Sequence, residues 1–302
     1  MKKGWFTGSD KKKRYSLGNG VVATGTKKIG STWYVFNAKN GTIALGSTSM
    51  SYVFFGHGKR VLVLLPGLSD GLMTVKGKAL LLAKPYQMFF EKYTVYMFSR
   101  KDDMPEGYSI EDMADDQAEA LRLFGIRKAS IMGVSQGGMI AQYLAVGYPD
   151  LVEKLVIAVS APYANELIHE NVERWMAYAE QGDHKGLMID TAEKGYSEAY
   201  LKKFRKSYPV IGLVGKPKDY KRFMINSKAI LNFDIRNRLN EIHCPTLIIG
   251  GSEDRTVGIQ ASYEMHELIP DSELYVYPGL GHAAYEEAED FNMRVFRFLE
   301  AE

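Results

Sequence analysis

The residues most able to do chemistry lie in a Gly-rich stretch near the middle of the chain, IMGVSQGGM, residues 131–139. Ser135 stands between Gly133 and Gly137, and glycines at both positions allow a tight turn from a strand into a helix. Such a turn would raise the Ser135 hydroxyl above a sheet and aim a helix N-terminus at it, which favours developing negative charge. The alternative is a Gly-rich corner without a nucleophile, so the surrounding sequence must decide.

A serine hydroxyl is a weak nucleophile at its own pKa, so it needs a base and a group that orients the base. Among six histidines, His282 is the candidate base, because it follows the last expected strand in a loop able to bring an imidazole over the sheet. Asp254, in the loop after the preceding strand, would fix the tautomer of His282 and stabilise its protonated form. Glu253 is the alternative acid in that loop.

The elements that must position these residues alternate between strands and helices from about Ser47 to the end of the chain. The expected strands cover residues 52–55, 60–65, 94–98, 129–134, 155–159, 246–249 and 274–277. Helical spacing is clear in residues 109–124, 136–148, 259–268 and 286–299. This alternation predicts an α/β fold with a mostly parallel sheet covered by helices.

The alternation stops between about residues 163 and 240, where 167–181, 196–206 and 218–231 look helical. A helical block inserted into an α/β framework is typical of a lid. The alternative is a plain packing layer, and the two differ in whether the block borders a cavity. Scattered Met, Tyr and Phe residues in the block predict a mainly apolar pocket, although a helical core has the same composition.

Several motifs in a fixed order resemble the α/β-hydrolase superfamily over residues 47–302: VLVLLPGLSDG, IMGVSQGGMIAQYLAVGYP, CPTLIIGGSEDRTV and YPGLGHAAYEEAEDF. The resemblance implies a catalytic triad of Ser135, Asp254 and His282. It also implies an oxyanion hole made by the backbone N–H groups of Leu68 and Gln136. The family often has His-Gly where this chain has Pro66-Gly67, so the backbone donors survive while a role for that histidine side chain is absent.

The function expected from these residues is a serine hydrolase that cleaves a small-molecule ester-like acyl bond through an acyl-enzyme on Ser135. An acyltransferase, a thioesterase or a C–C-bond hydrolase would use the same triad, because fold does not decide substrate. The chemistry needs no cofactor, and we find no metal-ligand spacing, P-loop or dinucleotide-binding fingerprint. The rival from another class is a cell-wall- or choline-binding protein on a non-catalytic hydrolase fold.

Residues 1–46 differ from the rest and contain two similar units, each with an Asn-Gly pair, at Asn19-Gly20 and Asn40-Gly41. Asn-Gly is a strong hairpin signal, so each unit is predicted to be a small β-hairpin. The segment resembles the aromatic repeats of cell-wall-binding and choline-binding proteins, which implies that Trp5, Trp33 and Tyr34 contact choline or cell-wall glycan. The presence of only two units is the main departure from that family.

Composition limits the remaining classes of function. The chain has 302 residues, 46% hydrophobic and 25% charged, as in a soluble globular protein. A net charge of +2 argues against a nucleic-acid-binding protein, although Lys and Arg crowd the first thirty residues. The longest apolar runs are too short for a membrane span, and no export signal is evident. We therefore expect a cytoplasmic protein, with the cell surface as the alternative suggested by the repeats.

Overall fold

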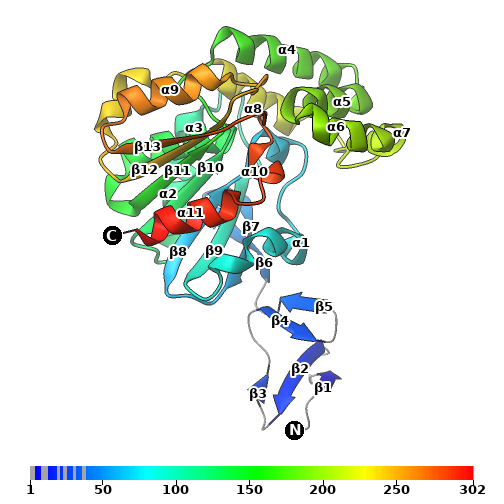
Figure 1. Ribbon diagram of the computed structural model, residues 1–302, viewed down its shortest axis with the longest axis vertical. Coiled ribbons are helices and arrows are strands. Elements are labelled where there is room, and N and C mark those ends of the chain that lie inside the picture. Colours follow the sequence, from blue (N-terminus) through cyan, green and yellow to red (C-terminus); the bar gives the residue numbers. More distant parts are fainter. Residues whose placement is uncertain are drawn as a thin grey trace.

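A central eight-stranded sheet dominates the computed structural model, which describes residues 39–301 in full and, before them, the backbone of five strands between residues 4 and 35 (Figure 1). The strands of this sheet are β6 (Lys39–Leu45), β7 (Thr48–Gly56), β8 (Arg60–Leu65), β9 (Tyr93–Lys101), β10 (Ala129–Val134), β11 (Val152–Ala158), β12 (Thr246–Gly251) and β13 (Ser272–Tyr277). Their order across the sheet is β13-β12-β11-β10-β8-β9-β7-β6. Neighbours from β9 to β13 are parallel, whereas β7 and β6 are antiparallel additions at one edge.

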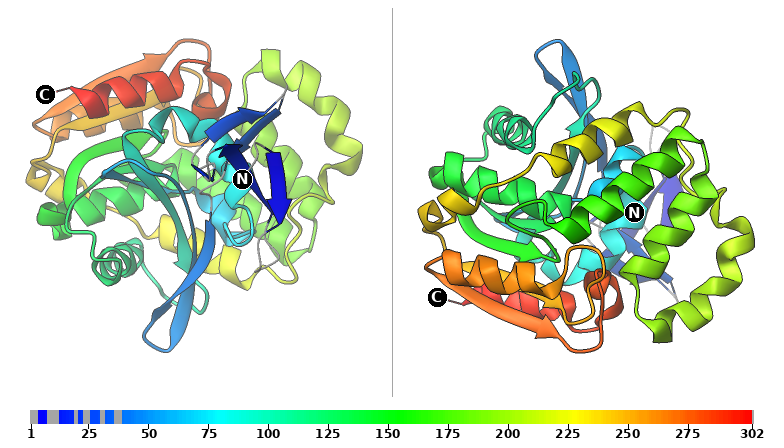
Figure 2. Two further views of the ribbon diagram at one scale, coloured as in Figure 1. Left: turned by 90° about the horizontal axis from the view of Figure 1, so that it is seen from below. Right: turned by 90° about the horizontal axis from the view of Figure 1, so that it is seen from above.

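Helices cover both faces of the sheet, as the sequence predicts (Figures 1 and 2). The helices are α1 (Ala79–Ala83), α2 (Ile110–Leu123), α3 (Gln136–Gly147), α9 (Ile259–Leu268), α10 (Ala284–Glu287) and α11 (Phe291–Glu300), and two short 3-10 helices, η1 (Leu68–Gly71) and η2 (Lys84–Phe89), follow β8 and α1. Side chains of β8 alternate between two buried clusters. Val63 and Leu65 join the cluster that contains α2 and α3, and Leu62 and Leu64 join the one that contains α11.

The stretch between β11 and β12 is helical, in the place where the sequence loses its alternation. It contains α4 (Glu166–Glu180), α5 (His184–Gly195), α6 (Glu198–Phe204), α7 (Tyr208–Ile211) and α8 (Lys221–Leu231), which we call the inserted block. Side-chain oxygens of Asn165, Asp183 and Ser197 accept from backbone N–H groups in the first turns of α4, α5 and α6. These N-caps fix where three of the helices begin.

One hairpin predicted near the N-terminus is wrong. Asn40 and Gly41 lie within β6 and pair with Val53 and Tyr52 of β7, so residues 39–45 belong to the large sheet. The turn instead follows Leu45, where Gly46 has a φ of 58°. The far end of the Tyr52 side chain packs directly over Gly41, so this glycine lies in a packed strand and not in a turn.

The first 38 residues contain β1 (Gly4–Thr7), β2 (Lys13–Gly18) and β3 (Val21–Val22) in one small sheet, and β4 (Thr26–Ile29) and β5 (Thr32–Val35) in another. β2 and β3 pair in antiparallel fashion on either side of Asn19-Gly20. Trp5, Trp33 and Tyr34 belong to β1 and β5, but their side chains lie outside the described residues. Within the described part of the chain, no helix has the length and apolar character needed to cross a membrane.

Candidate active site

Ser135 occupies the sharp turn between β10 and α3 that the sequence predicts. Its backbone has φ of 54° and ψ of −121°, a left-handed conformation that costs a non-glycine residue free energy and occurs often at functional sites. The turn is held because the Ser135 N–H donates to the carbonyl of Ala158 on β11 at 2.9 Å. Both flanking glycines are required, since a Cβ at Gly133 would overlap the Gly137 carbonyl and a Cβ at Gly137 would overlap the Leu65 carbonyl.

His282 connects Ser135 to Asp254. Its Nε2 lies 2.9 Å from Ser135 Oγ, and its Nδ1 lies 2.8 Å from Asp254 Oδ2. An ionised carboxylate can only accept, so Nδ1 carries the proton that is donated to Asp254 and Nε2 is left to accept from the serine hydroxyl. Asp254, rather than Glu253, faces His282: Asp254 is buried and Glu253 is exposed.

The carboxylate of Asp254 is fixed by three partners, of which His282 contacts Oδ2. Its second oxygen, Oδ1, accepts from the backbone N–H groups of Thr256 at 2.8 Å and Val257 at 2.9 Å. Burial alone would raise the pKa of Asp254, but the charge and hydrogen bond of His282 and the two backbone N–H groups outweigh burial, and the pKa lies below its usual value. The acid therefore stays ionised and orients the imidazole.

The backbone N–H groups of Leu68 and Gln136 stand at the starts of two helices beside Ser135. Gln136 is the first residue of α3 and Leu68 the first of η1, so neither N–H has a partner within its own helix. Within residues 39–301, neither donates to another protein acceptor. The loop before Leu68 passes close to the serine, because a Cβ at Gly67 would lie 3.3 Å from Ser135 Cβ and 3.8 Å from its Oγ.

The side chain of Gln136 is also used, which sequence reasoning did not foresee. It is fully buried; its Oε1 accepts from Arg100 Nη2 at 2.8 Å and its Nε2 donates to the Asn226 carbonyl on α8 at 3.0 Å. Burial lowers the pKa of Arg100 to about 10, against the opposing charge of Asp70, so the guanidinium remains protonated at neutral pH. A positive charge is thus hydrogen-bonded to the side chain of the residue that follows Ser135.

Asp70 pairs with this arginine and with the inserted block. Its Oδ2 accepts from the Arg100 backbone N–H at 3.0 Å and from Arg222 Nη2 of α8 at 2.8 Å. Arg222 also donates to the carbonyls of Asp70, Arg100 and Lys101. A local sequence pattern carries no signal for this network, because its members come from η1, β9, α3 and α8.

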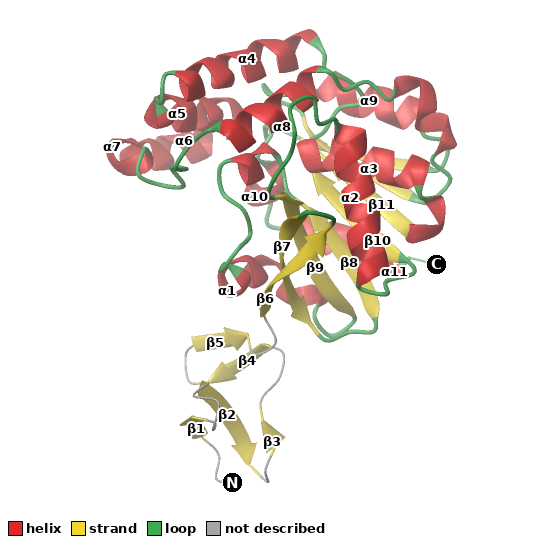
Figure 3. Ribbon diagram, turned by 180° about the vertical axis from the view of Figure 1, so that it is seen from behind, coloured by secondary structure: helices red, strands yellow, loops and turns green. Residues whose placement is uncertain are grey.

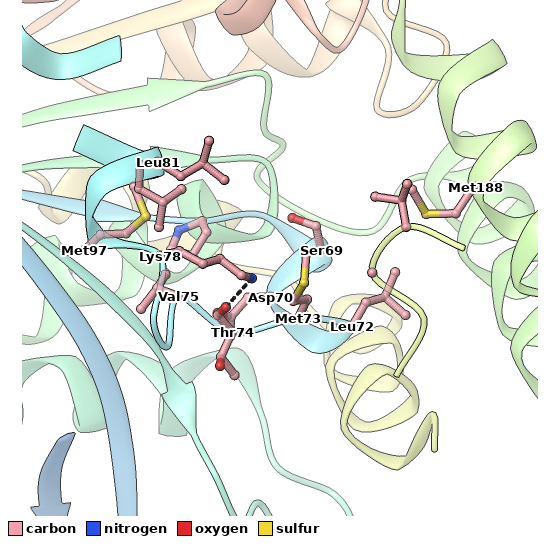
Figure 4. Close-up of a pocket in the computed structure, with 14 residues that line it drawn as sticks. Ser69, Asp70, Leu72, Met73, Thr74, Val75, Lys78, Leu81, Met97 and Met188 are labelled. Atoms are coloured by element: carbon pink, nitrogen blue, oxygen red, sulfur yellow. Dashed lines mark hydrogen bonds between the residues drawn. The ribbon is translucent and has the colours of Figure 1, made fainter. Parts of the chain in front are cut away.

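A pocket of about 290 Å³ lies next to the loop that carries Leu68 (Figure 4). Pro66 and Ser69, on either side of Gly67-Leu68, form one wall, and Met188 and Val214 of the inserted block form another. The remaining lining residues are mostly Leu, Met and Val: Asp70, Leu72, Met73, Thr74, Val75, Lys78, Leu81, Leu82, Met97 and Gly215. The pocket is mainly apolar, but only Met188, Val214 and Gly215 of its lining belong to the inserted block, and it contains none of the Tyr and Phe residues predicted to line it. Within residues 39–301 no cluster of His, Cys, Asp and Glu could hold a metal ion.

Comparison with known proteins decides the family. The family described as "alpha/beta hydrolase fold" matches residues 96–289. This chain belongs to the α/β-hydrolase fold family. A putative carbamate hydrolase RutD of Serratia proteamaculans (strain 568) is 28% identical over 212 residues, which cover 66% of this chain and 76% of that protein.

Two further similarities agree with the family. A 2-hydroxy-6-oxononadienedioate/2-hydroxy-6-oxononatrienedioate hydrolase of Comamonas testosteroni is 26% identical over 226 residues, covering 70% of this chain and 73% of that protein. The structure also resembles MGS-M2, an α/β-hydrolase enzyme from a Medee basin deep-sea metagenome library, with a TM-score of 0.77 at 20% identity, over 87% of this chain and 98% of the other. The curated relatives are hydrolases, and the solved structure shares the fold.

The close approach at Gly137 can be tested by stability. Gly137→Ala should lower the free energy of unfolding by roughly 1–3 kcal/mol, because the added methyl group overpacks against the Leu65 carbonyl. Gly147→Ala, in the same helix, is the matched control, since a Cβ there meets no atom within 4 Å. Urea midpoints of the two variants would be compared with wild type, and equal midpoints for both variants would contradict the packing described.

The side-chain role of Gln136 gives a second expectation. Gln136→Met should destabilise the protein by about 1–3 kcal/mol, because it leaves a donor of the buried Arg100 without a partner and removes the additional hydrogen bond to the Asn226 carbonyl. Gln117→Met, which removes one hydrogen bond to the Ser99 carbonyl from another buried glutamine, should cost less. Urea unfolding measures both, and the reverse order would show that the Gln136 amide is dispensable.

The low pKa of Asp254 predicts a stability change in acid. Because the folded pKa lies below the ordinary value of 3.8, the ionised Asp254 contributes stability above pH 3.8 that is lost as the pH falls through the folded value. The difference in unfolding free energy between wild type and Asp254→Asn should therefore shrink as the pH is lowered below 3.8. Asp150→Asn, at an exposed position in a surface turn, controls for the loss of one negative charge. A wild-type-to-variant difference that does not change with pH would contradict this assignment.

Proposed function

We propose that this protein is a serine hydrolase that cleaves a small-molecule ester-like acyl bond through an acyl-enzyme on Ser135. The observation that carries the proposal is the continuous hydrogen-bonded series from Asp254 through His282 to the Ser135 hydroxyl. The three residues follow three different strands, β12, β13 and β10, so the order of the sheet brings them to one edge. Nucleophile, base and orienting acid are then within reach of one another before substrate binds.

In the proposed reaction, Ser135 Oγ attacks the carbonyl carbon while His282 Nε2 takes the hydroxyl proton. The resulting oxyanion is stabilised by the N–H groups of Leu68 and Gln136, at the start of η1 and of α3. Collapse of the tetrahedral intermediate breaks the acyl–oxygen bond, and protonated His282 gives its proton to the leaving alcohol. Water, deprotonated by His282, then attacks the acyl-enzyme and releases the acid and Ser135.

The pocket supports an uncharged, apolar acyl or alcohol portion. Its volume of about 290 Å³ is at the lower end of what small-molecule sites occupy, roughly 300–1,000 Å³. Most of its wall is Leu, Met and Val, and its one ammonium group, that of Lys78, already donates to the Thr74 carbonyl at 2.5 Å. This lining favours a monoester over a dianionic compound such as the one named for the Comamonas testosteroni relative. Because the inserted block forms one wall, we propose that it serves as the lid.

The test is labelling with a fluorophosphonate probe together with turnover of the nitrophenyl esters of acetate, butyrate, hexanoate, octanoate and laurate. Wild type should label and turn over at least one ester. Ser135→Ala should abolish labelling, and each of Ser135→Ala and His282→Gln should lower kcat by roughly 10⁴–10⁶-fold, with a somewhat smaller loss in Asp254→Asn. Ser49→Ala, which removes a hydroxyl on β7 that bonds Asp102, is the control and should keep both properties.

Two outcomes would contradict the proposal: no labelling or turnover by wild type, or wild-type turnover by Ser135→Ala. Addition of a primary alcohol to the ester assay distinguishes acyl transfer from hydrolysis, since a transferase makes the new ester faster than the free acid. Retention of the protein on immobilised choline or cell-wall glycan, lost in Trp33→Ala, would support the binding role predicted for the N-terminal segment.

A further inference from the structure

Two stretches of the chain that frame the pocket, residues 71–90 and 199–218, contain nine Lys or Arg residues and no acidic residue. The chain as a whole carries 38 basic and 36 acidic residues, so the charge of these stretches is a strong local excess. Arg205 pairs with both Glu193 and Glu198, so these three residues together carry a charge of −1 and Arg205 adds nothing to the excess. Within residues 39–301 the lysines that form ion pairs are Lys92 and Lys101, both outside the two stretches. The other eight basic residues are all lysines: Lys76, Lys78, Lys84, Lys202, Lys203, Lys206, Lys216 and Lys218.

The same two stretches contain most of the large hydrophobic side chains that the described part of the chain exposes. Seven of the ten lie there: Met73, Leu80, Leu81, Tyr200, Val210, Leu213 and Val214. Leu213 is 81% exposed and Leu81 71%. Single exposed leucines are ordinary, but apolar side chains that gather on one charged surface indicate an interaction site. We call residues 71–90 and 199–218 together the basic-apolar face.

The two stretches lie on one side of the molecule and meet at the pocket. Met73 and Leu81 line it from one stretch, and Val214 and Gly215 from the other. A Cβ on Gly215 would lie 3.4 Å from Met73 Cε, so the stretches are in contact distance there. In Figures 1 and 3, α1 and α7 lie on the same side of the molecule, and Figure 4 shows Leu81, Met73 and Met188 around the pocket.

The exposure of the apolar side chains is built into the local backbone. The Val214 carbonyl is 2.8 Å from Nε2 of the buried His184, and the N–H groups of Leu213 and Val214 donate to Val210 and Ile211 carbonyls at 3.0 Å. These backbone groups of the turn therefore have hydrogen-bond partners inside the protein. The side chain of Leu213 is exposed, and that of Val214 is partly exposed and also lines the pocket.

We infer that the basic-apolar face docks the protein onto an anionic lipid surface, with the pocket opening toward the lipid. Lysines beside exposed Leu, Val and Met are what a peripheral protein needs, because the ammonium groups meet anionic headgroups while the apolar side chains enter the boundary of the acyl chains. Lysine side chains can also extend their charged ends past apolar neighbours. An apolar ester dissolved in the lipid would then reach the pocket without crossing water. This delivery of substrate rests on the proposed function, whereas the docking to lipid is independent of it.

The test is co-sedimentation of the full chain with vesicles of phosphatidylcholine alone and with one third phosphatidylglycerol. Wild type should prefer the anionic vesicles by at least about tenfold, and added salt should weaken this binding. A basic residue near an anionic surface contributes roughly a fivefold gain, so Lys202→Gln/Lys203→Gln/Lys206→Gln should lose about a hundredfold. Leu213→Ser/Val214→Ser should lose at least about tenfold through the apolar part.

Matched variants distinguish the contribution of this face to vesicle binding from the effect of removing basic or apolar residues elsewhere. Arg127→Gln/Lys128→Gln and Leu123→Ser change exposed residues at the end of α2 and in the loop that leads to β10, outside the basic-apolar face, and should bind like wild type. Lys11→Gln/Lys12→Gln/Lys13→Gln tests the basic N-terminal segment. Ser135→Ala should bind vesicles as wild type does, which keeps this result independent of the proposed reaction. Three results would overturn the inference. They are equal binding of wild type to both kinds of vesicle, wild-type binding by the variants of the basic-apolar face, and a loss of vesicle binding in the N-terminal variant alone.

Discussion

The close approach of Gly137 to the Leu65 carbonyl is the contact on which the candidate site depends. It brings the first turn of α3 against the end of β8, and a side chain at position 137 would separate the two. Because β8 and β10 are neighbours in the parallel sheet, the loops that follow them start at the same edge. Gly67 therefore passes directly beside Ser135, whose strained backbone joins β10 to α3.

The inserted block is connected by hydrogen bonds to every loop of the site. Asn165 and Asn171 of α4 donate to the carbonyls of residues 255–257 in the loop that carries Asp254. The N–H of Ala283, next to His282, donates to the Gly195 carbonyl at the end of α5. On the far side, Asn226 accepts from Gln136 and Arg222 pairs with Asp70. The block thus does more than cover the sheet, because its movement would disturb the loops on both sides of Ser135.

The alternation of strands and helices and the turn at Ser135 were predictable, because period and glycine spacing are local properties of a sequence. The hairpin at Asn40-Gly41 was not. Its turn propensity gives way to seven paired positions with β7, and the far end of the Tyr52 side chain packs over Gly41. The network of Asp70, Arg100 and Arg222 was also beyond reach, since its partners are far apart in the chain and a buried arginine looks the same in sequence as a surface one.

Two buried charges are linked to the site by hydrogen bonds, Asp254 through His282 and Arg100 through the side chain of Gln136. Asp254 remains ionised because His282 and two backbone N–H groups offset its burial. Burial and the charge of Arg222 lower the pKa of Arg100, and the charge of Asp70 raises it. The resulting pKa of about 10 keeps Arg100 protonated at neutral pH. In the proposed mechanism, negative charge develops on the carbonyl oxygen of the substrate, which the N–H of Gln136 would hold. At the same time, positive charge appears on His282. The Asp254 carboxylate contacts the ring that would become the imidazolium, and the Arg100 guanidinium contacts the side chain of Gln136, so each charge has the sign that stabilises its end of the proposed charge separation. Since neither group must reorient during the reaction, the free energy of arranging them is spent in folding.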